Sequence, residues 1–424
     1  MRGGEPMVSW AEAEGERINR AVGTPMSPRE PLIFIVSGEA SGDNLAGPLM
    51  RALKTQTGGR VRFAGVGGPQ SEGQGLESLF PMRELSVMGL AEVLPHLPRL
   101  IRRLNETVDA VRRLKPDAII TVDSPGFCLR LAHHLRGSGI PIIHYVAPQL
   151  WAWRPGRARQ LSKRIDHIMA LLPFEVPFFA KYGIPCTYVG HPAIDSGVER
   201  GDGPAFRARH GLPQDAPVLC IVPGSRAGEV RRMLPVFAEA LVLLKESYPD
   251  LHIVIPVVPT TVETVSGLTR DWPLPVVFAD IAERHDAFAA SNAAMAKSGT
   301  VTLELALANV PMVVGYRVSA ATAFLVRRMG VSVQHASLVN LLAGREVVPE
   351  LLQEDCTVAR LAAAVDELLR SKEARDAQLQ GFREIVKVLG DRSPSPSERA
   401  AKVVLDILEG RKPEASPTRV STAG

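Results

Sequence analysis

Short apolar segments alternate with longer amphipathic segments along most of this chain. The first apolar segment, residues 32–36, reads Leu-Ile-Phe-Ile-Val and is followed by Ser-Gly, which is typical of a strand buried on both faces of a parallel sheet. Leu45, Leu49 and Leu53 then recur every four residues, which predicts a helix with one apolar face. Further strands of this series are expected at residues 61–66, 118–122, 141–146, 168–172 and 186–189.

The alternation starts again after residues 196–216, which are rich in Gly, Asp and Pro and which we interpret as a linker. Strands of the second series are expected at residues 218–222, 251–255, 276–278, 293–296 and 310–314. Strands that alternate with helices form parallel sheets with right-handed crossovers. The pattern therefore predicts an α/β chain with two Rossmann-like, doubly wound parallel-sheet domains that face each other across a cleft.

The length of 424 residues exceeds what one typical hydrophobic core supports and agrees with two domains. We expect residues 30–200 to form the N-terminal domain and residues 210–395 the C-terminal domain. Residues 396–410 are expected to form a helix that packs back on the N-terminal domain or on a partner subunit. Residues 1–29 and 411–424 are interpreted as a disordered tail and a loose tail.

The composition indicates the cellular compartment of the protein but not its binding partner. The four cysteines are widely scattered without a C-x-x-C pair, which argues against a disulfide framework and a zinc site and fits a reducing compartment. No segment reaches the ~18 apolar residues of a membrane-spanning helix, and the N-terminal sequence lacks the apolar core of a secretory signal. We therefore expect a cytoplasmic protein. The net charge of +4 is too small to name a partner.

Open α/β sheets bind ligands beyond the carboxyl ends of their strands, so the residues that follow each strand are the candidate site. The first such segment is Ser-Gly-Glu-Ala-Ser-Gly-Asp at residues 37–43. Its carboxylates, Glu39 and Asp43, would repel a phosphate and suit sugar hydroxyls better. A strand-to-helix turn capped by Ser41 or Asp43 is the alternative interpretation.

Asp123 ends the apolar strand expected at residues 118–122. Burial would raise the pKa of a carboxylate at this place toward that of a useful general base. A helix N-cap before Pro125 is the equally good alternative from the residues alone.

Two segments of the second series favour an anionic ligand. Gly224, Ser225 and Arg226 follow its first strand, where backbone N–H groups at a helix start and a guanidinium can bind phosphate. Ser298, Gly299 and Thr300 begin another helix in the same way, and Glu304 lies one turn further on, where it could accept ribose hydroxyls. The alternative makes Ser298 a plain N-cap and Glu304 a solvated residue. The segment 337–346, which contains Asn340, has no interpretation by itself.

Two basic stretches remain. Residues 91–115 mix apolar and basic side chains in a way that suits an anionic membrane surface. Residues 151–164 place two tryptophans beside several arginines, a combination also found in proteins that bind single-stranded nucleic acid. An ordinary solvated helix face is the better interpretation of either stretch alone.

Taken together, the motifs resemble those of the lipid-A-disaccharide synthase family, and they occur in its order across about residues 31–408. They are SGEASGD (37–43), GVGGP (65–69), ELSVMG (84–89), HYVAPQLWAWR (144–154), LPFE (172–175), VGHP (189–192), PGSR (223–226), SGT (298–300) and SLVNLLAGRE (337–346).

The resemblance implies a glycosyltransferase-B fold and an inverting transfer that needs no metal or cofactor. The implied donor is UDP-2,3-diacylglucosamine, the acceptor is 2,3-diacylglucosamine 1-phosphate (lipid X), and the product is the β-1,6-linked precursor of lipid A. The implied setting is the cytoplasmic surface of the inner membrane of a Gram-negative bacterium, with no nucleic acid as partner. A homodimer is left open.

The resemblance also implies roles for particular residues. Asp123 would take the proton of the acceptor hydroxyl and Arg226 would stabilise the departing UDP. The implied UDP-binding residues are Gly224, Ser225, Arg226, Ser298, Gly299, Thr300, Glu304 and Asn340, and the implied acceptor-binding residues are Glu39, Ser41, Asp43, Gly67 and Gly68. Membrane contact is implied for Val87, Met88, Leu90, Val93, Leu94 and Leu97.

Two residues depart from expectation. Pro48 should kink the helix after the SGEASGD motif or shorten its hydrogen-bond ladder. Lys297 stands where a small residue is expected and could add a donor near the phosphates.

The alternatives within the fold are a UDP-N-acetylglucosamine transferase of cell-wall synthesis and a UDP-sugar epimerase. A non-catalytic RNA-binding protein is the alternative of another class, and it leaves Arg226, Ser298 and Glu304 without a purpose.

Overall fold

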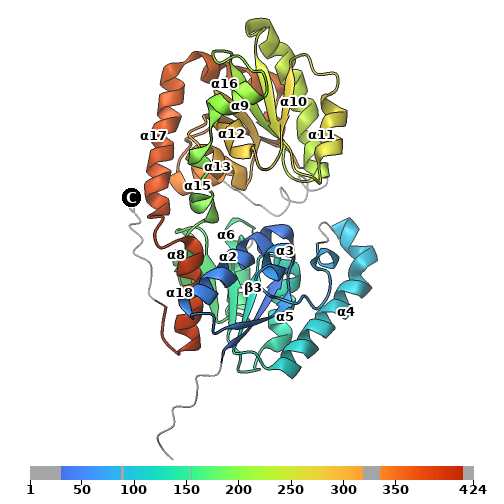
Figure 1. Cartoon of the computed structure of the whole chain (residues 1–424), viewed down its shortest axis with the longest axis vertical. Coiled ribbons are helices and arrows are strands. Elements are labelled where there is room, and N and C mark those ends of the chain that lie inside the picture. The colour runs from blue at the N-terminus through green and yellow to red at the C-terminus, as the bar shows by residue number, and fades with distance from the viewer. Residues whose placement is uncertain (1–29, 87–89, 154, 319–334, 414–424) are drawn as a thin grey trace, which may run out of the picture.

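The computed structural model describes residues 30–86, 90–153, 155–318 and 335–413. Two parallel six-stranded sheets form two domains, one above the other along the long axis (Figure 1). The N-terminal sheet has the order β2-β1-β3-β4-β5-β6 and the C-terminal sheet the order β12-β11-β10-β7-β8-β9. The predicted pair of doubly wound parallel sheets is therefore confirmed.

The strands of the N-terminal sheet are β1 (Leu32–Ser37), β2 (Arg62–Val66), β3 (Ala118–Val122), β4 (Ile142–Tyr145), β5 (His167–Ala170) and β6 (Cys186–Tyr188). The helices of this domain are α2 (Ala40–Gln56), α3 (Pro69–Glu72), α4 (Leu90–Leu114), α5 (Pro125–Leu135), α6 (Leu150–Trp153), α7 (Ala158–Leu161) and α8 (Glu175–Ala180), with short 3-10 turns η1 (Met82–Glu84) and η2 (Pro155–Arg157). Helix α2 continues on both sides of Pro48, which lies inside it.

The strands of the C-terminal sheet are β7 (Val218–Val222), β8 (His252–Pro256), β9 (Val276–Ala279), β10 (Ala293–Lys297), β11 (Met312–Tyr316) and β12 (Glu350–Leu352). Its helices are α9 (Gly203–Arg209), α10 (Ala227–Ser247), α11 (Val262–Thr269), α12 (Arg284–Ala289), α13 (Thr300–Leu307), α15 (Leu338–Ala343), α16 (Val358–Arg370) and α17 (Lys372–Leu389), with 3-10 turns η3 (Pro192–Asp195), η4 (Val198–Arg200) and η5 (Gln353–Asp355). Strand β12 was not predicted, because three residues are too short to show a period.

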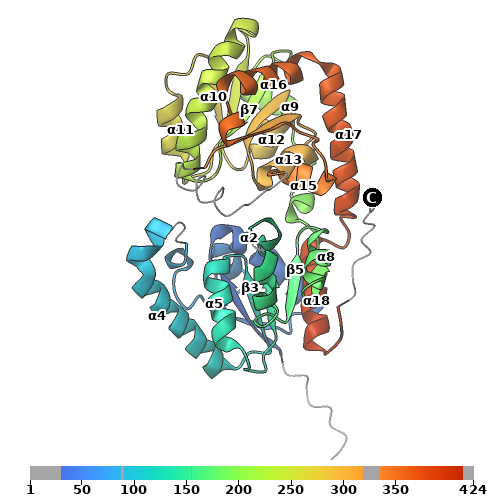
Figure 2. The same cartoon turned by 180° about the vertical axis from the view of Figure 1, so that it is seen from behind.

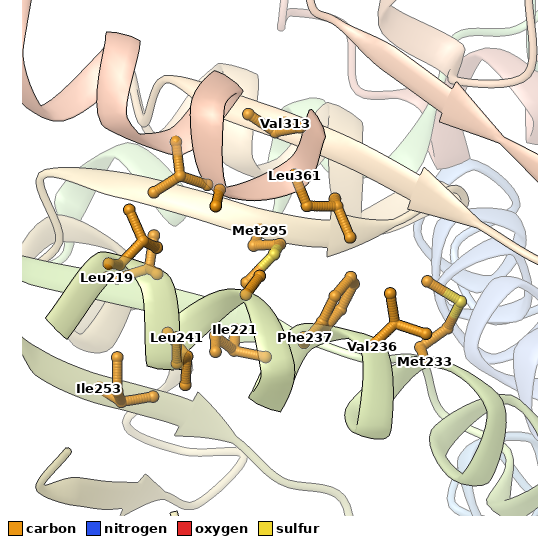
Figure 3. Packing of buried hydrophobic residues seen from close by; sticks show 14 of the residues in the cluster. Leu219, Ile221, Met233, Val236, Phe237, Leu241, Ile253, Met295, Val313 and Leu361 are labelled. Atoms are coloured by element: carbon orange, nitrogen blue, oxygen red, sulfur yellow. The ribbon is translucent and has the colours of Figure 1, made fainter. Parts of the chain in front are cut away.

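The core of the C-terminal domain lies between its sheet and helices α10 and α16 (Figure 3). Met233, Phe237 and Leu241 of α10 are almost fully buried, and their spacing of four residues places them on one helix face. They pack against Ile221 of β7 and Met295 of β10. This packing fixes α10 on the sheet, and with it the loop between β7 and α10.

The segment predicted to be a linker holds more structure than expected. Helix α9 lies within it and packs against α12. The buried Arg207 guanidinium donates to the carbonyl oxygens of Ala290, Pro213 and Gln214, at distances between 2.7 and 3.1 Å. These bonds tie the end of the segment to the C-terminal domain, so the connection between the domains is shorter than the sequence suggested.

The chain crosses back to the N-terminal domain near its end. Helix α17 runs along the C-terminal domain, and α18 (Pro396–Leu408) lies against α2 (Figures 1 and 2). Val404 of α18 is fully buried in a cluster with Leu49 and Leu53, and Arg399 Nε donates to the carbonyl oxygen of Val189 at 2.8 Å. The two domains are thus joined by two chain crossings. Within the residues that the structure describes, no helix is both long and apolar enough to cross a membrane.

Candidate active site

A cavity of about 820 Å³ lies between the two domains. Most of its lining comes from the N-terminal domain, while Arg226, Thr300 and Leu338 line it from the C-terminal domain. Both sheets reverse their strand order here, at β1 and β3 in one and at β7 and β10 in the other. The predicted residues Glu39, Asp123, Arg226 and Thr300 all line this cavity, so the structure brings the chemical groups of both domains together.

Asp123 stands in a strained turn at the end of β3. Asp123 and Ser124 have φ values of 50° and 45°, and Val146 at the end of β4 has a φ of 78°. Such left-handed conformations are unfavourable for residues with a side chain, most of all for a β-branched one, and cluster at functional sites. A Cβ atom on Gly38 would lie 2.3 Å from Ser124 Oγ, so only glycine leaves room for this turn.

The turn excludes one of the two interpretations of Asp123, the helix N-cap. Helix α5 begins at Pro125, and its N-cap is Ser124, whose side chain makes no capping hydrogen bond. Asp123 therefore does not cap the helix. Its carboxylate faces the cavity and accepts a long hydrogen bond of 3.5 Å from Ser41 Oγ, which leaves it available for a proton from a ligand.

Glu39 links the domains across the cavity. Its Oε2 lies 3.5 Å from Nη2 of Arg226, which belongs to the C-terminal domain. Burial raises the pKa of Glu39 above its ordinary value, the Arg226 charge lowers it, and the Asp123 charge raises it again. Glu39 makes no capping bond to α2, so its carboxylate faces the cavity as predicted for a sugar-binding group.

Asp43 does not fit the predicted role in acceptor binding. Its carboxylate is buried and accepts hydrogen bonds from the backbone N–H groups of Gly68, Gln70 and Ser71, at 2.8 to 3.1 Å, and from Ser71 Oγ at 2.5 Å. Four donors satisfy both oxygens, so none is left for a sugar. Asp43 instead holds the start of α3 and, with it, the loop of Gly67 and Gly68. That loop does not line the cavity.

Arg226 belongs to a cluster of charges on the C-terminal side. It is the N-cap residue of α10, and its Nη1 lies 3.6 Å from Glu229 Oε1. Lys297 Nζ lies 3.0 Å from the same oxygen and 4.9 Å from the ring centre of Tyr316. Glu229 therefore holds Lys297 beside Arg226, which explains how a long basic residue is accommodated before Ser298. Gly224 and Ser225 form the adjoining turn, in which Gly224 has a φ of 116°.

The second segment predicted to bind phosphate, residues 298–300, also begins a helix, but Ser298 is not its N-cap. The N-cap of α13 is Gly299, and the buried Ser298 donates from Oγ to the carbonyl oxygen of Ala336 at 2.7 Å. Ser298 is thus not a plain N-cap, and the O–H donor of its side chain is already used. Thr300, the first residue of α13, lines the cavity.

Glu304 lies one turn into α13 and is not solvated. Burial raises the pKa of its carboxyl group, and the charge of Arg284 lowers it. The two side chains form an ion pair of 3.4 Å. The alternative that treated Glu304 as a solvated residue is therefore wrong.

Asn340 is a second correction to the predicted site. The side chain is fully buried. Its Oδ1 accepts from the N–H groups of Val347 and Val348, and its Nδ2 donates to the carbonyl oxygen of Val348 and to Glu350 Oε1, at 2.7 to 3.0 Å. These four bonds use every donor and acceptor of the amide. The Asn340 side chain therefore has no bond left for UDP. It instead ties α15, whose first residue Leu338 lines the cavity, to residues 347–350.

Three buried side chains of the cavity received no role from the sequence: His144, Glu175 and His191. Burial lowers the pKa of both histidines to about 4 and raises the pKa of Glu175 to about 8. All three are therefore mainly uncharged near neutral pH. Each lies in one of the family motifs, HYVAPQLWAWR, LPFE or VGHP, at or after the carboxyl end of β4, β5 or β6. That position in the sequence could have identified them as candidate site residues.

The predicted membrane contacts are only partly within the described structure. Val87 and Met88 lie outside the described residues, and the side chains of Leu90, Val93 and Leu94 in α4 are not described either. Leu97 is partly buried. The described residues include no group of three His, Cys, Asp or Glu side chains arranged to hold a metal ion.

Two Rossmann-like domains that face each other across a cavity define the fold class of glycosyltransferase-B enzymes and sugar-nucleotide epimerases. Solved structures agree on the fold: a UDP-GlcNAc 2-epimerase from Neisseria meningitidis bound to UDP-GlcNAc has a TM-score of 0.58 at 12% identity, with 90% of this chain and 100% of that chain covered. The calicheamicin glycosyltransferase has a TM-score of 0.55 at 19% identity, with 90% and 99% covered.

Sequence comparison is more specific. A family model described as lipid-A-disaccharide synthetase matches residues 33–404. The lipid-A-disaccharide synthase of Rhodospirillum centenum is 51% identical over 383 residues, which are 90% of this chain and 95% of that protein. The one of Gluconobacter oxydans is 48% identical over 378 residues, 89% and 91% of the two chains. The chain therefore belongs to the lipid-A-disaccharide synthase family and is a glycosyltransferase, which confirms the resemblance found in the sequence.

The environment of Glu175 predicts a dependence of stability on pH. An unfolded glutamate has a pKa of about 4.3, whereas the folded chain raises the pKa of Glu175 to about 8. The folded state binds the proton more tightly, so stability is fully present below the unfolded pKa and is lost as the pH rises through the folded pKa. Because Glu175→Gln cannot ionise, its melting temperature relative to that of the wild type should rise as the pH increases from about 4.3 to about 8.

The measurement is the thermal midpoint of both proteins at several pH values. The exposed Glu246 provides the control, because Glu246→Gln should melt in parallel with the wild type. Parallel curves for Glu175→Gln as well would show that Glu175 is ionised in the folded state and would contradict this assignment.

Proposed function

We propose that this glycosyltransferase moves 2,3-diacylglucosamine from UDP to the 6-hydroxyl of 2,3-diacylglucosamine 1-phosphate, in one displacement with inversion. The observation that carries the proposal is the placement of Asp123 and Arg226 on opposite walls of one cavity. Such a transfer requires a base beside the acceptor hydroxyl and a cation beside the departing diphosphate.

In the proposed step, Asp123 takes the proton of the acceptor hydroxyl while the oxygen attacks the anomeric carbon of the donor. The bond from that carbon to the diphosphate oxygen breaks, and UDP leaves with the electron pair. Arg226 and the backbone N–H groups at the start of α13 meet the charge of the departing diphosphate. Because the protein itself supplies these groups, the proposal requires no metal ion or cofactor.

Donor binding also has a consequence for Glu39. Arg226 is shared between Glu39 and Glu229, at 3.5 and 3.6 Å. A diphosphate offers the guanidinium a more strongly charged partner than a carboxylate. We expect UDP to replace Glu39 on Arg226, which frees the Glu39 carboxylate to accept hydrogen bonds from sugar hydroxyls.

The acyl chains of both substrates require contact with a bilayer. We propose that the start of α4, with the preceding Val87 and Met88, provides it, because apolar residues here are followed by many arginines. Such a segment binds an anionic surface by apolar burial and charge together.

Replacing Asp123 tests the proposed base. Asp123→Asn keeps the shape but cannot accept the proton, so turnover should fall by about 10²–10⁴-fold while the affinity for UDP stays unchanged. Turnover is measured as UDP release with both lipid substrates in detergent, and UDP affinity by calorimetry. The exposed Asp250 offers a matched control, and Asp250→Asn should alter neither quantity. Turnover of Asp123→Asn near the wild-type value would rule out Asp123 as the base.

Replacing Arg226 tests the proposed diphosphate contact. Charge-assisted hydrogen bonds contribute about 1.5–3 kcal/mol, so Arg226→Gln should weaken UDP binding about tenfold to a hundredfold. The control is Arg231→Gln, because Arg231 is exposed on the same helix and does not line the cavity. Calorimetric titration with UDP gives both affinities, and an unchanged affinity for Arg226→Gln would refute the phosphate role.

Replacing apolar residues near the start of α4 tests the membrane contact. Met88→Ser with Leu90→Ser should reduce co-sedimentation with vesicles that contain phosphatidylglycerol more than it reduces activity on detergent-dispersed substrates. Val242 and Leu243 of α10 are 52% and 44% exposed, and the pair of serine substitutions there is the control. Equal sedimentation of all three proteins would assign the segment to packing within the domain.

A further inference from the structure

One wall of the cavity carries two arginines that the proposed reaction does not use. Arg157, Gln160, Leu161 and Arg164 all line the cavity. Arg157 ends the 3-10 turn η2, Gln160 and Leu161 belong to the short helix α7, and Arg164 lies in the turn that follows it. This short segment of chain therefore contributes both arginines to the same wall of the cavity.

The structure shows no partner for these two guanidinium groups among the residues it describes. Neither forms an ion pair or a side-chain hydrogen bond with any residue that the structure describes. None of the three carboxylates of the cavity forms an ion pair with either arginine. Glu39 pairs with Arg226, Glu175 accepts from the Leu172 N–H group and Trp151 Nε1, and Asp123 accepts only a long hydrogen bond from Ser41. Two like charges on one wall without a counter-charge favour an anionic ligand.

A buried polar atom of His144 independently indicates that the same cavity binds a ligand. Its side chain is fully buried, and Nδ1 lies 2.8 Å from Thr121 Oγ1. Its Nε2 has no hydrogen-bond partner among the described residues, although buried polar atoms nearly always have one. Since His144 lines the cavity, a polar ligand group can complete its bonding.

The position of the arginines indicates which anion they bind. Arg226 and Thr300, which we assign to the donor diphosphate, line the cavity from the C-terminal domain, whereas Arg157 and Arg164 line it from the N-terminal domain, as Asp123 does. The donor diphosphate is assigned to the C-terminal domain. An anion bound on the same wall as Asp123, the proposed base, is therefore assigned to the acceptor. We propose that Arg157 and Arg164, with Gln160 between them, form a phosphate-monoester subsite that binds the anomeric phosphate of the acceptor sugar.

This inference rests on the proposed function and deepens it. A phosphate monoester carries a charge of about −1.5 to −2 at pH 7, which two arginines can balance. Holding the acceptor by the phosphate at one end of its sugar leaves the hydroxyl at the other end to approach Asp123. The subsite would then both select phosphorylated acceptors and orient them.

The test compares the acceptor with its dephosphorylated form, 2,3-diacylglucosamine, for the wild type and for Arg157→Gln with Arg164→Gln. Binding is measured by calorimetry in detergent, and KM is measured for each acceptor at saturating donor. The wild type should bind the phosphorylated form at least about tenfold more tightly. The double variant should lose that preference, with an unchanged affinity for UDP.

Controls separate this subsite from a general effect of charge. Arg159 and Lys163 are exposed and do not line the cavity, so Arg159→Gln with Lys163→Gln should keep the wild-type preference. If the arginines instead bind anionic lipid headgroups, Arg157→Gln with Arg164→Gln will reduce sedimentation with phosphatidylglycerol vesicles and keep the preference for phosphate, which overturns the proposal. Equal loss of affinity for both acceptor forms also overturns it.

Failure of the proposed function has a different signature. If the wild type releases no UDP with either acceptor, the proposed transfer is wrong, yet the binding measurements still report on the subsite. A tenfold preference for the phosphorylated sugar that depends on Arg157 and Arg164 would support the subsite without the reaction, and its absence would remove the subsite.

Discussion

The direction of the parallel strands is the constraint on which the site depends. In each sheet, the carboxyl ends of all strands lie at one edge, and the strand order reverses between two neighbours, β1 and β3 in one domain and β7 and β10 in the other. The loops at such a switch point diverge and leave a crevice. Because the two edges face each other, Asp123 and Arg226 come from different domains into one cavity, and α18, returning to α2, connects these domains a second time.

The two domains contribute chemically different groups to the cavity. The N-terminal domain contributes the strained turn of Asp123, the buried His144, Glu175 and His191, and two arginines without an ion-pair partner among the described residues. The C-terminal domain contributes Arg226 and the start of α13. The ion pair of Glu39 and Arg226, at 3.5 Å, joins the two walls. In the proposed reaction, donor binding at Arg226 would act on the acceptor wall through Glu39, whose pKa is raised by burial and also by the Asp123 charge.

The sequence predicted the fold well because the core strands are apolar and bounded by Gly, Ser and Asp. It also placed Asp123, Arg226, Thr300 and Glu39 at the cavity, since these follow strands at the switch points. It misjudged Asp43 and Asn340, because only the folded chain shows that other backbone and side-chain groups use the hydrogen bonds of their side chains. It interpreted the basic stretch that holds Arg157 and Arg164 as an ordinary solvated helix face, because its sequence pattern is the same whether the basic residues face water or a cavity.

The central claim is a single displacement in which Asp123 activates the acceptor and Arg226 receives the diphosphate. The most direct measurement is the time course of UDP release from the α-linked donor with and without the phosphorylated acceptor, together with the anomeric configuration of the product by proton NMR. The account predicts that UDP is released only when acceptor is present, one for each disaccharide, and that the new linkage is β. Release of UDP without acceptor, or a product with the α configuration, would contradict it.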